Sequence, residues 1–272
     1  MYNITCSIVL YHHNPQSLTP LISSLIDCNI VSKIILVDNS STDELKILAS
    51  DNKIEYIFNN SNIGYGAAHN IALTKVLAYS KYHIVLNPDI VFKKGTIENI
   101  CNYMEQHPET GHIMPKIKYP DGALQYACKL LPAPADLIFR RFLPAVLIKK
   151  RMRHFEMRDS GYNKIMEVPY LSGCFMFLRV EALKKAGLFD ERFFMYPEDI
   201  DLTRRICKYY KTIFYPYVEI THVHERGSYK SFRLFFIHIV NMIKYFNKWG
   251  WIFDKERKDI NKTIAAQYSN NN

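Results

Sequence analysis

The sequence lacks an apolar run long enough to cross a membrane. A membrane-spanning helix needs about 18–20 consecutive apolar residues. Charged or polar side chains interrupt every hydrophobic stretch of this 272-residue chain before that length. It also lacks a signal peptide, because Met1-Tyr2-Asn3 leads straight into a strand-like segment. We therefore expect a cytoplasmic protein without a transmembrane anchor.

Cysteine pairs with the spacing of metal or redox sites are missing too. No CxxC occurs, and the histidines and cysteines do not combine at the spacing of a zinc site. Scattered cysteines without such pairs predict reduced thiols in a cytoplasm. The six cysteines are Cys6, Cys28, Cys101, Cys128, Cys174 and Cys207.

The common phosphate-binding fingerprints are absent or incomplete. The chain has no GxxxxGK[ST] motif, which argues against a P-loop site. Gly64-Tyr65-Gly66 precedes a helix-like segment, but His69 stands where GxGxxG has its third glycine. The motif also follows the third predicted strand instead of the first. A dinucleotide-dependent oxidoreductase is therefore disfavoured.

Acidic residues are too few to balance the basic ones, which leaves a formal charge of +9. Such a charge indicates an anionic partner: a small ligand, a membrane surface or a nucleic acid. Nucleic acid is disfavoured, because no recognised binding motif accompanies the charge. Many of the basic residues lie among prolines and aromatics in segment 130–166. This segment is either a basic aromatic arm at a membrane surface or anionic substrate, or a solvated face on short helices.

What the sequence does contain is a regular alternation of strand and helix patterns. Short apolar runs at 6–10, 34–37, 54–58 and 83–86 predict buried strands, and the segments between them predict helices. Because crossovers between parallel strands are right-handed, helices should cover both faces of the sheet. We expect an α/β, Rossmann-like fold with a mostly parallel central sheet and a C-terminal helical appendage.

Polar or glycine-bearing turns follow these strands. Ligands of open α/β sheets bind beyond the carboxyl ends of the strands, so these turns should form one binding edge. Asp38 can hold the base or ribose of a nucleotide, amides near Gly64 its phosphates, and Asp89 a hard divalent cation. Alternatively, Asp89 is an ordinary turn acid after Pro88. The turns are Tyr11-His12-His13, Asp38-Asn39-Ser40, Asn62 to Gly66 and Asn87-Pro88-Asp89.

The second half of the chain contributes an acidic helix start. Pro197 suits the beginning of a helix, and Glu198 and Asp199 suit its positive N-terminal end. Asp199 is then either a general base that faces a cleft or a capping acid. The buried face of this helix is predicted from helical spacing to comprise Leu202, Ile206 and Tyr209.

Two segments near this helix carry weaker signals. Gly173 interrupts a buried, extended run and predicts a bend or a close backbone approach. One or both of His222 and His224 can complete a metal or phosphate site, although a histidine near a strand end is more often a core or surface residue.

A helix predicted over 231–247 carries a long apolar stripe. We expect the stripe to pack on the domain, and the alternative is that its end near Trp249 and Trp251 rests on a membrane. The stripe comprises Phe232, Phe235, Phe236, Ile239, Val240, Ile243 and Phe246.

These motifs occur in the order of a known family. The chain resembles the family 2 glycosyltransferases of the GT-A fold, most closely their bacterial rhamnosyltransferase-like branch. The resemblance spans nearly the whole chain. It rests on residues 7–11, 37–43, 62–70, 86–89, 171–173 and 187–205, and ends with His224 and Ser228.

The resemblance implies a division of the chain. A GT-A catalytic domain would cover residues 1–227, and a C-terminal helical segment residues 228–272. Residues 1–110 would bind a nucleotide sugar. Residues 111–227, with the basic insertion 130–166, would bind the acceptor.

The resemblance also implies roles for single residues. Asp199 is similar to the catalytic base of an inverting transfer, with Glu198 as its support. Asp89 would bind Mg²⁺ or Mn²⁺ together with His224 or, as the second choice, His222. The residues that bind the nucleotide sugar would be Tyr11, Asp38, Asn62, Gly64, Asn87 and Asp89. The acceptor residues would be Gly173, Phe194, Tyr196 and Asp201.

By the same resemblance, the donor would be a dTDP- or UDP-sugar, with dTDP-L-rhamnose as the first choice. The acceptor would be a polyprenyl-linked saccharide in the synthesis of O-antigen, capsule or cell wall. Such an enzyme would lie on the anionic inner face of the cell membrane and would not bind nucleic acid, and a homodimer is left open. The alternatives are a UDP-hexose-dependent glycosyltransferase and a non-catalytic protein that binds nucleotide sugars or membrane surfaces.

Overall fold

The computed structural model describes residues 3–137, 144–223 and 232–269. Within these residues, nine strands form one sheet, in the order β3-β2-β1-β4-β10-β6-β11-β5 with β8 paired to β11. The strands are β1 (Ile4–Leu10), β2 (Val31–Asp38), β3 (Ile54–Phe58), β4 (Tyr82–Leu86), β5 (Ile90–Phe92), β6 (Thr110–Lys118), β8 (Met166–Glu167), β10 (Phe175–Arg179) and β11 (Lys211–His222).

The first half of the chain folds as its alternating pattern predicts. Strands β1 to β4 pair with one another in parallel, and β1 is buried along its whole length. Asn14 caps α1 (Pro15–Ile26) by accepting the backbone N–H of Gln16. Further along, β10 runs antiparallel to β4 and β6, whereas β11 is parallel to β6. Strands β1 to β4, β6 and β11 therefore point the same way, and the sheet is mostly parallel.

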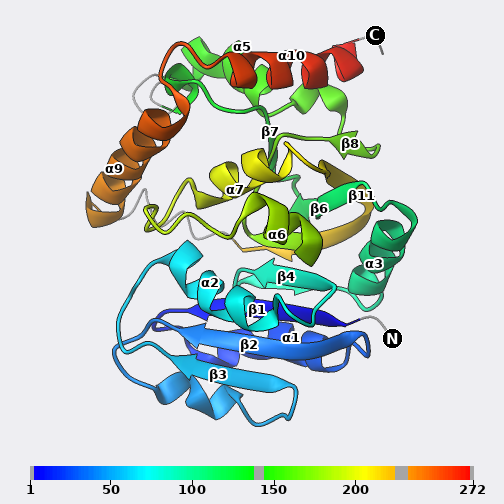
Figure 1. Cartoon of the computed structure of the whole chain (residues 1–272), viewed down its shortest axis with the longest axis vertical. Helices are drawn as coiled ribbons and strands as arrows, with labels where there is room; N and C mark the ends of the chain where they lie inside the picture. The colour runs from blue at the N-terminus through cyan, green and yellow to red at the C-terminus, as the bar shows by residue number, and fades with distance from the viewer. Residues whose placement is uncertain (1–2, 138–143, 224–231, 270–272) are drawn as a thin grey trace.

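Helices cover both faces of the sheet (Figure 1). On one face, Leu21 of α1 and Ile100 of α3 (Thr96–Gln106) pack in the same cluster as Ile8 of β1. On the other face, α2 (Tyr65–Val76), α6 (Val180–Ala186) and α7 (Glu198–Ile206) share a core in which Leu73 and Leu202 surround Val85 of β4. Because both faces are covered, the carboxyl ends of the strands are where a ligand can reach the sheet.

A further layer lies beyond this core. It contains α5 (Ala145–Phe155), η2 (Arg158–Ser160), the paired strands β7 (Cys128–Lys129) and β9 (Tyr170–Leu171), α9 (Phe232–Trp249) and α10 (Lys255–Ser269) (Figure 1). Tyr245 and Phe246 of α9 pack on Phe193 and Ile200, and so join the C-terminal helices to the start of α7.

Some details differ from the sequence-based predictions. Helix α7 ends at Ile206, so Tyr209 lies outside it and is exposed instead of buried. Strand β5 and helix α10 were not predicted as separate elements, and α10 extends to Ser269, the last residue that the structure describes. In the described part of the chain, no helix is both long enough and apolar enough to span a bilayer.

The predicted packing of the apolar stripe on α9 is wrong for its first three turns. Met242, Tyr245 and Phe246 are buried against the domain. The outward side of the same helix leaves four apolar side chains exposed: Phe232, Phe236, Val240 and Ile243.

Candidate active site

The turns that follow β1, β2 and β3 are joined by backbone hydrogen bonds at one edge of the sheet. The N–H of Asn39 donates to Leu10 O, and that of Asn59 donates to Asp38 O. The side chain of Asn39 then reaches Gly64 O at 3.2 Å. The predicted nucleotide-binding turns therefore do form one connected edge.

Asp38 lies inside this edge instead of on its surface. It is 0% exposed, its Oδ1 accepts the N–H of Ser40, and its Oδ2 accepts the Tyr56 hydroxyl at 2.6 Å. Direct contact with a base or ribose would need these bonds to open, so Asp38 shapes the turn in this structure. Tyr11 is nearly half exposed beside it. A cavity of about 100 Å³ between these turns is lined by His12, His13, Pro15, Ser40, Thr42, Glu44 and Leu45.

The loop after β3 is locked onto the segment that precedes α7. Gly64 has φ +96°, and a Cβ on it would lie 2.4 Å from Phe194 O. The next residue, Tyr65, donates its N–H to that same oxygen at 2.9 Å. Asn62 supports the loop from the other side, because its Oδ1 accepts the Gly64 N–H. A glycine is required here by both the backbone angle and the contact.

Tyr65 joins three parts of the site, a role that no local sequence pattern indicates. Its hydroxyl lies 2.9 Å from Asn87 Oδ1 and 3.0 Å from Gly173 O. Burial raises the pKa of Tyr65 well above its usual value, so the phenol keeps its proton and acts as the donor. The turn after β4 and the bend before β10 are thereby held side by side.

Asp89 and His222 meet at the ends of β4 and β11. His222 Nε2 lies 3.3 Å from Asp89 Oδ1. Gln125 fixes the ring, because its Nε2 donates to His222 O and its Oε1 is left to accept from Nδ1 at 3.1 Å. Burial alone would lower the pKa of His222, but Cys174 and Asp89 raise that pKa to about 10. The expected ligand His224 lies outside the described residues.

This pair suits a divalent cation that also takes oxygens from a ligand. A carboxylate and an imidazole, with the second ring nitrogen bonded to an amide oxygen, are typical protein donors to such ions. Among the described residues, no group of three or more His, Cys, Asp and Glu side chains gathers at metal-binding distance. The protein would therefore contribute Asp89 and His222, and phosphates and water would complete the coordination.

Asp199 stands in the first turn of α7 and faces Gly173. The Gly173 N–H donates to its Oδ2 at 3.0 Å, and the Ile200 N–H donates to its Oδ1 at 2.8 Å. A Cβ on Gly173 would lie 2.9 Å from Asp199 Cβ, which explains why a residue without a side chain stands there. Burial raises the pKa of Asp199, although Lys129 and the two amides oppose the shift. A carboxylate with a raised pKa suits a general base.

Glu198, the neighbour of Asp199, is buried, and one of its carboxyl oxygens lacks a hydrogen bond in the described part of the chain. Its Oε2 has no hydrogen-bond partner among residues 3–137, 144–223 and 232–269. Burial and the nearby charge of Asp199 raise the pKa of Glu198 from 4.5 to about 8. Near neutral pH the pair therefore retains a proton, and Glu198 in its neutral form does not compete with Asp199 for an incoming proton.

Stability should therefore depend on pH through Glu198. A carboxyl whose pKa is raised by folding stabilises the protein below its unfolded pKa, and this contribution is lost as pH rises from 4.5 to about 8. We expect Glu198→Gln to be more stable than the wild type by about 2–4 kcal/mol at pH 9 and equally stable at pH 4.5. Urea unfolding across this pH range measures the difference. The exposed Glu181→Gln in the first turn of α6 is the control, and an identical pH dependence in all three proteins would contradict the assignment.

The expected acceptor residues fall into two groups. Phe194 and Tyr196 are half-buried, and Phe194 O contacts the loop that carries Gly64. Asp201, by contrast, is 0% exposed. Its carboxylate accepts from Arg205, Lys248 and Trp249, at 2.6–2.8 Å. Its placement in an acceptor cleft is therefore wrong, because it anchors α9 instead.

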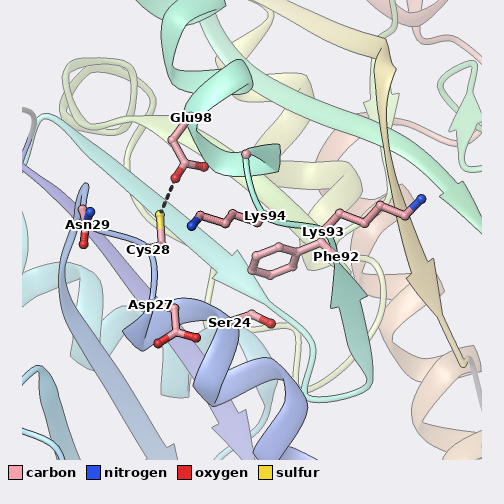
Figure 2. Close-up of a pocket in the computed structure, with 9 residues that line it drawn as sticks. Ser24, Asp27, Cys28, Asn29, Phe92, Lys93, Lys94 and Glu98 are labelled. Carbon is pink, nitrogen blue, oxygen red and sulfur yellow. Dashed lines mark hydrogen bonds between the residues drawn. The ribbon is translucent and has the colours of Figure 1, made fainter.

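A larger cavity lies away from this edge, between α1, β5 and the start of α3. It measures about 400 Å³, and none of the predicted donor or acceptor residues lines it. Figure 2 shows carboxylates and lysines on its walls: Asp27, Glu98, Lys93 and Lys94. The thiol of Cys28 donates a hydrogen bond to Glu98 Oε1, with 3.6 Å between Sγ and the oxygen. The charges of the two lysines and the two carboxylates balance, so this cavity shows no preference for an anionic donor.

Proteins whose names state an activity are similar in sequence to much of this chain. N-acetylglucosaminyl-diphospho-decaprenol L-rhamnosyltransferase of Mycobacterium tuberculosis is 27% identical over an alignment of length 205 that covers 70% of this chain and 66% of that protein. The chain thus spans just under two thirds of that relative's length. Rhamnosyltransferase WbbL of Escherichia coli is 26% identical over an alignment of length 206 that covers 73% of this chain and 75% of that protein.

Solved structures share the fold at lower sequence identity. GalNAc-T7, crystallised with UDP, GalNAc and Mn²⁺, superposes with a TM-score of 0.59 over 82% of this chain and 43% of its own, at 16% identity. Mannosyltransferase PcManGT from Pyrobaculum calidifontis, in complex with GDP-Man and Mn²⁺, gives 0.55 over 83% of this chain and 58% of its own, also at 16% identity. These similarities confirm the GT-A fold.

A family model also matches most of the region that builds the site. It is described as glycosyl transferase family 2 and covers residues 6–187, which is more than half of the chain. The match includes the strand-end turns, Asp89 and Gly173. The predicted resemblance is thereby confirmed, and the chain belongs to glycosyl transferase family 2.

Proposed function

We propose that this protein is an inverting glycosyltransferase that moves a sugar from a nucleoside diphosphate to a hydroxyl group of a saccharide. The observation that carries this proposal is the placement of Asp199. Its carboxylate is held against Gly173, and Tyr65 joins Gly173 to Asn87, two residues before Asp89. A base and a diphosphate-binding turn are thus parts of one hydrogen-bonded unit.

The chemistry follows from this arrangement. Asp199 accepts the proton of the acceptor hydroxyl while the hydroxyl oxygen forms a bond to the anomeric carbon. The bond from that carbon to the diphosphate oxygen breaks on the opposite face, so the configuration inverts. The Gly173 and Ile200 N–H groups keep the carboxylate oriented toward the acceptor.

The leaving diphosphate gains negative charge, which the other half of the site has to stabilise. Asp89 and His222 would hold Mg²⁺ or Mn²⁺, and such an ion neutralises a leaving diphosphate. His222 Nε2 would bind such an ion only without its proton, so cation binding would release the proton that the raised pKa keeps there in the free protein. In this proposal residues 1–110 bind the donor and residues 111–227 bind the acceptor.

We further propose dTDP-L-rhamnose as the donor and a polyprenyl-linked saccharide as the acceptor. Support comes from the relatives in Mycobacterium tuberculosis and Escherichia coli, both named as rhamnosyltransferases, the first of them acting on a decaprenol-linked sugar. A UDP-hexose is the second candidate, because a Haloferax volcanii relative that is 28% identical is named as a hexosyltransferase.

The donor proposal predicts a metal-linked loss of binding in Asp89→Ala. We expect the Kd for the donor nucleotide in Mn²⁺ to rise at least about tenfold, because a ligand to the cation is removed. In EDTA the variant and the wild type should bind equally. Calorimetry with dTDP-L-rhamnose and UDP-hexoses, with and without Mn²⁺, measures this and ranks the donors.

Asp121→Ala is the matched control, since Asp121 also follows a proline in a turn and is exposed. Its affinity for the donor should equal that of the wild type. An Asp89→Ala variant with wild-type affinity throughout the Mn²⁺ titration would contradict the assigned cation site. Binding without release of the nucleoside diphosphate in the presence of acceptor would favour the non-catalytic alternative.

A further inference from the structure

Helix α9 exposes an apolar stripe that the proposed chemistry does not use. Phe232 is 86% exposed and Phe236 61%, and Val240 and Ile243 continue the line at helical spacing. The turn after the helix adds Ile252 and Phe253, the latter 92% exposed. Exposed residues at i, i+4, i+8 and i+11 share one side of a helix, so the four side chains form a ridge about 16 Å long.

The charged side chains that α9 itself contributes are all basic. Its 18 positions contain Arg233, Lys244 and Lys248 and no acidic residue, and Lys248 points to the inner side, where it pairs with Asp190 and Asp201. Arg233 adjoins Phe232 and Lys244 adjoins Ile243, and both cationic residues are exposed. Helix α5 has the same character, with exposed Val146 and Leu147, four lysine and arginine residues and no acid.

We propose that the outer side of α9 and the turn after it dock in the plane of an anionic phospholipid membrane. An amphipathic helix with apolar residues on its outer side and cationic residues beside them is suited to the headgroup region of a bilayer. Trp251, partly exposed beside Ile252, belongs to a residue type that is enriched at this depth.

Charge favours the bilayer over a second copy of the chain. In a two-fold contact each stripe would face its own image, which brings like cationic residues together. Without acidic residues on α9, no salt bridge from that helix would offset this repulsion. Anionic headgroups, in contrast, neutralise the same residues.

This inference deepens the proposed function, because it assigns the surface on which a lipid-linked acceptor would meet the site. The inner side of α9 holds the segment that leads into α7. Asn241 Nδ2 donates to Met195 O and Lys244 Nζ donates to Arg192 O, each at 2.8 Å. Helix α9 is about 10 Å across, so docking of its outer side places this segment within about one helix diameter of the headgroups.

Vesicle sedimentation with the full chain tests the docking surface. We expect the wild type to bind vesicles with about 30% phosphatidylglycerol at least about tenfold more tightly than pure phosphatidylcholine vesicles, and more weakly in about 0.5 M NaCl. The triple variant Phe232→Ser, Phe236→Ser, Phe253→Ser should lose at least about tenfold in binding. The control Ile47→Ser, Tyr79→Ser removes exposed side chains elsewhere and should bind as the wild type does.

Tryptophan fluorescence and the oligomeric state in solution are measured as well, so that each outcome supports or contradicts the docking surface. Tryptophan emission of the wild type should shift to the blue on anionic vesicles, since Trp251 lies in the turn of the proposed docking surface. This test holds even if the triple variant fails to fold. Equal vesicle binding by the triple variant and the control, or a wild-type dimer that the triple variant dissociates while neither binds vesicles, would overturn the proposal. Because no sugar is present, the result stands apart from the donor test.

Discussion

Asp199→Asn is expected to lower kcat for sugar transfer by about 10²–10⁴-fold, the range that a general base contributes. The amide has nearly the shape of the carboxylate but cannot accept the proton of the acceptor hydroxyl. Its carbonyl can still accept the Gly173 N–H, as Oδ2 does now at 3.0 Å. The fold and the donor site should therefore be retained, and donor affinity should stay within about threefold of the wild type.

Transfer to a saccharide acceptor and calorimetric titration of the donor measure the two quantities separately. Asp121→Asn serves as the matched control, because Asp121 also accepts a backbone N–H, that of Ala123, but lies on an exposed turn. Its kcat should equal that of the wild type. Normal turnover by Asp199→Asn would remove Asp199 from the base role, while a parallel loss of donor affinity would indicate a general disturbance of the site.

The elements that depend on short-range signals could be predicted from the sequence. Strand β3 has the predicted bounds, and Asn14 and Pro15 set the start of α1 as their residue types indicate. Strand β5 could not be predicted in this way. It has three residues and forms only because Ile90 to Phe92 pair with Thr221 and its neighbours on β11, which are distant in sequence.

The candidate site also combines residues that local signals indicate with contacts that join distant parts of the chain. Asp199 and Gly173 stood out because an acid at a helix start and a glycine in an extended run are local signals. The links from Tyr65 to Asn87 and from Gln125 to His222 cross 22 and 97 residues, so no local pattern reports them. The role of Asp201 was predicted wrongly for the related reason that its partners Lys248 and Trp249 come from helix α9.

In helix α9, the spacing of apolar residues predicts the helix but not which side of it is buried. The spacing of its apolar residues was read correctly as a helix, but apolar residues occur on more than one side of it. Spacing identifies which residues share a side, and the tertiary fold decides which side meets the domain. The side of α9 that carries Tyr245 and Phe246 is the buried one, because it packs on Phe193 and Ile200.

The largest loss of stability is expected where α7 meets the C-terminal segment. Arg204 is 1% exposed and makes a bidentate pair with Asp254, both bonds at 2.7 Å, while its guanidinium stacks on Trp249 at 4.0 Å. Glu256 adds a third contact at 2.8 Å. Burial alone would raise the pKa of Asp254, but Arg204 and the Arg257 N–H keep that pKa below its usual value.

Asp254→Asn should destabilise the fold by about 3 kcal/mol at pH 7, because it leaves the buried Arg204 charge with Glu256 as its remaining partner. For a chain of this size the Tm should fall by about 6–12 °C. Asp254 stabilises the fold above its unfolded pKa, and that contribution is lost as pH falls, so the difference from the wild type should shrink in acid. Urea unfolding and thermal melts measure both effects.

Asp159→Asn is the control, since Asp159 pairs with Arg153 at the surface and its loss should change stability by less than about 1 kcal/mol. The double variant Arg204→Met, Asp254→Leu discriminates further. Removal of both charges leaves no unpaired ion, so it should be more stable than Asp254→Asn. If the double variant were instead less stable than the single one, packing around Trp249, not the buried charge pair, would be what joins α7 to the C-terminal helices.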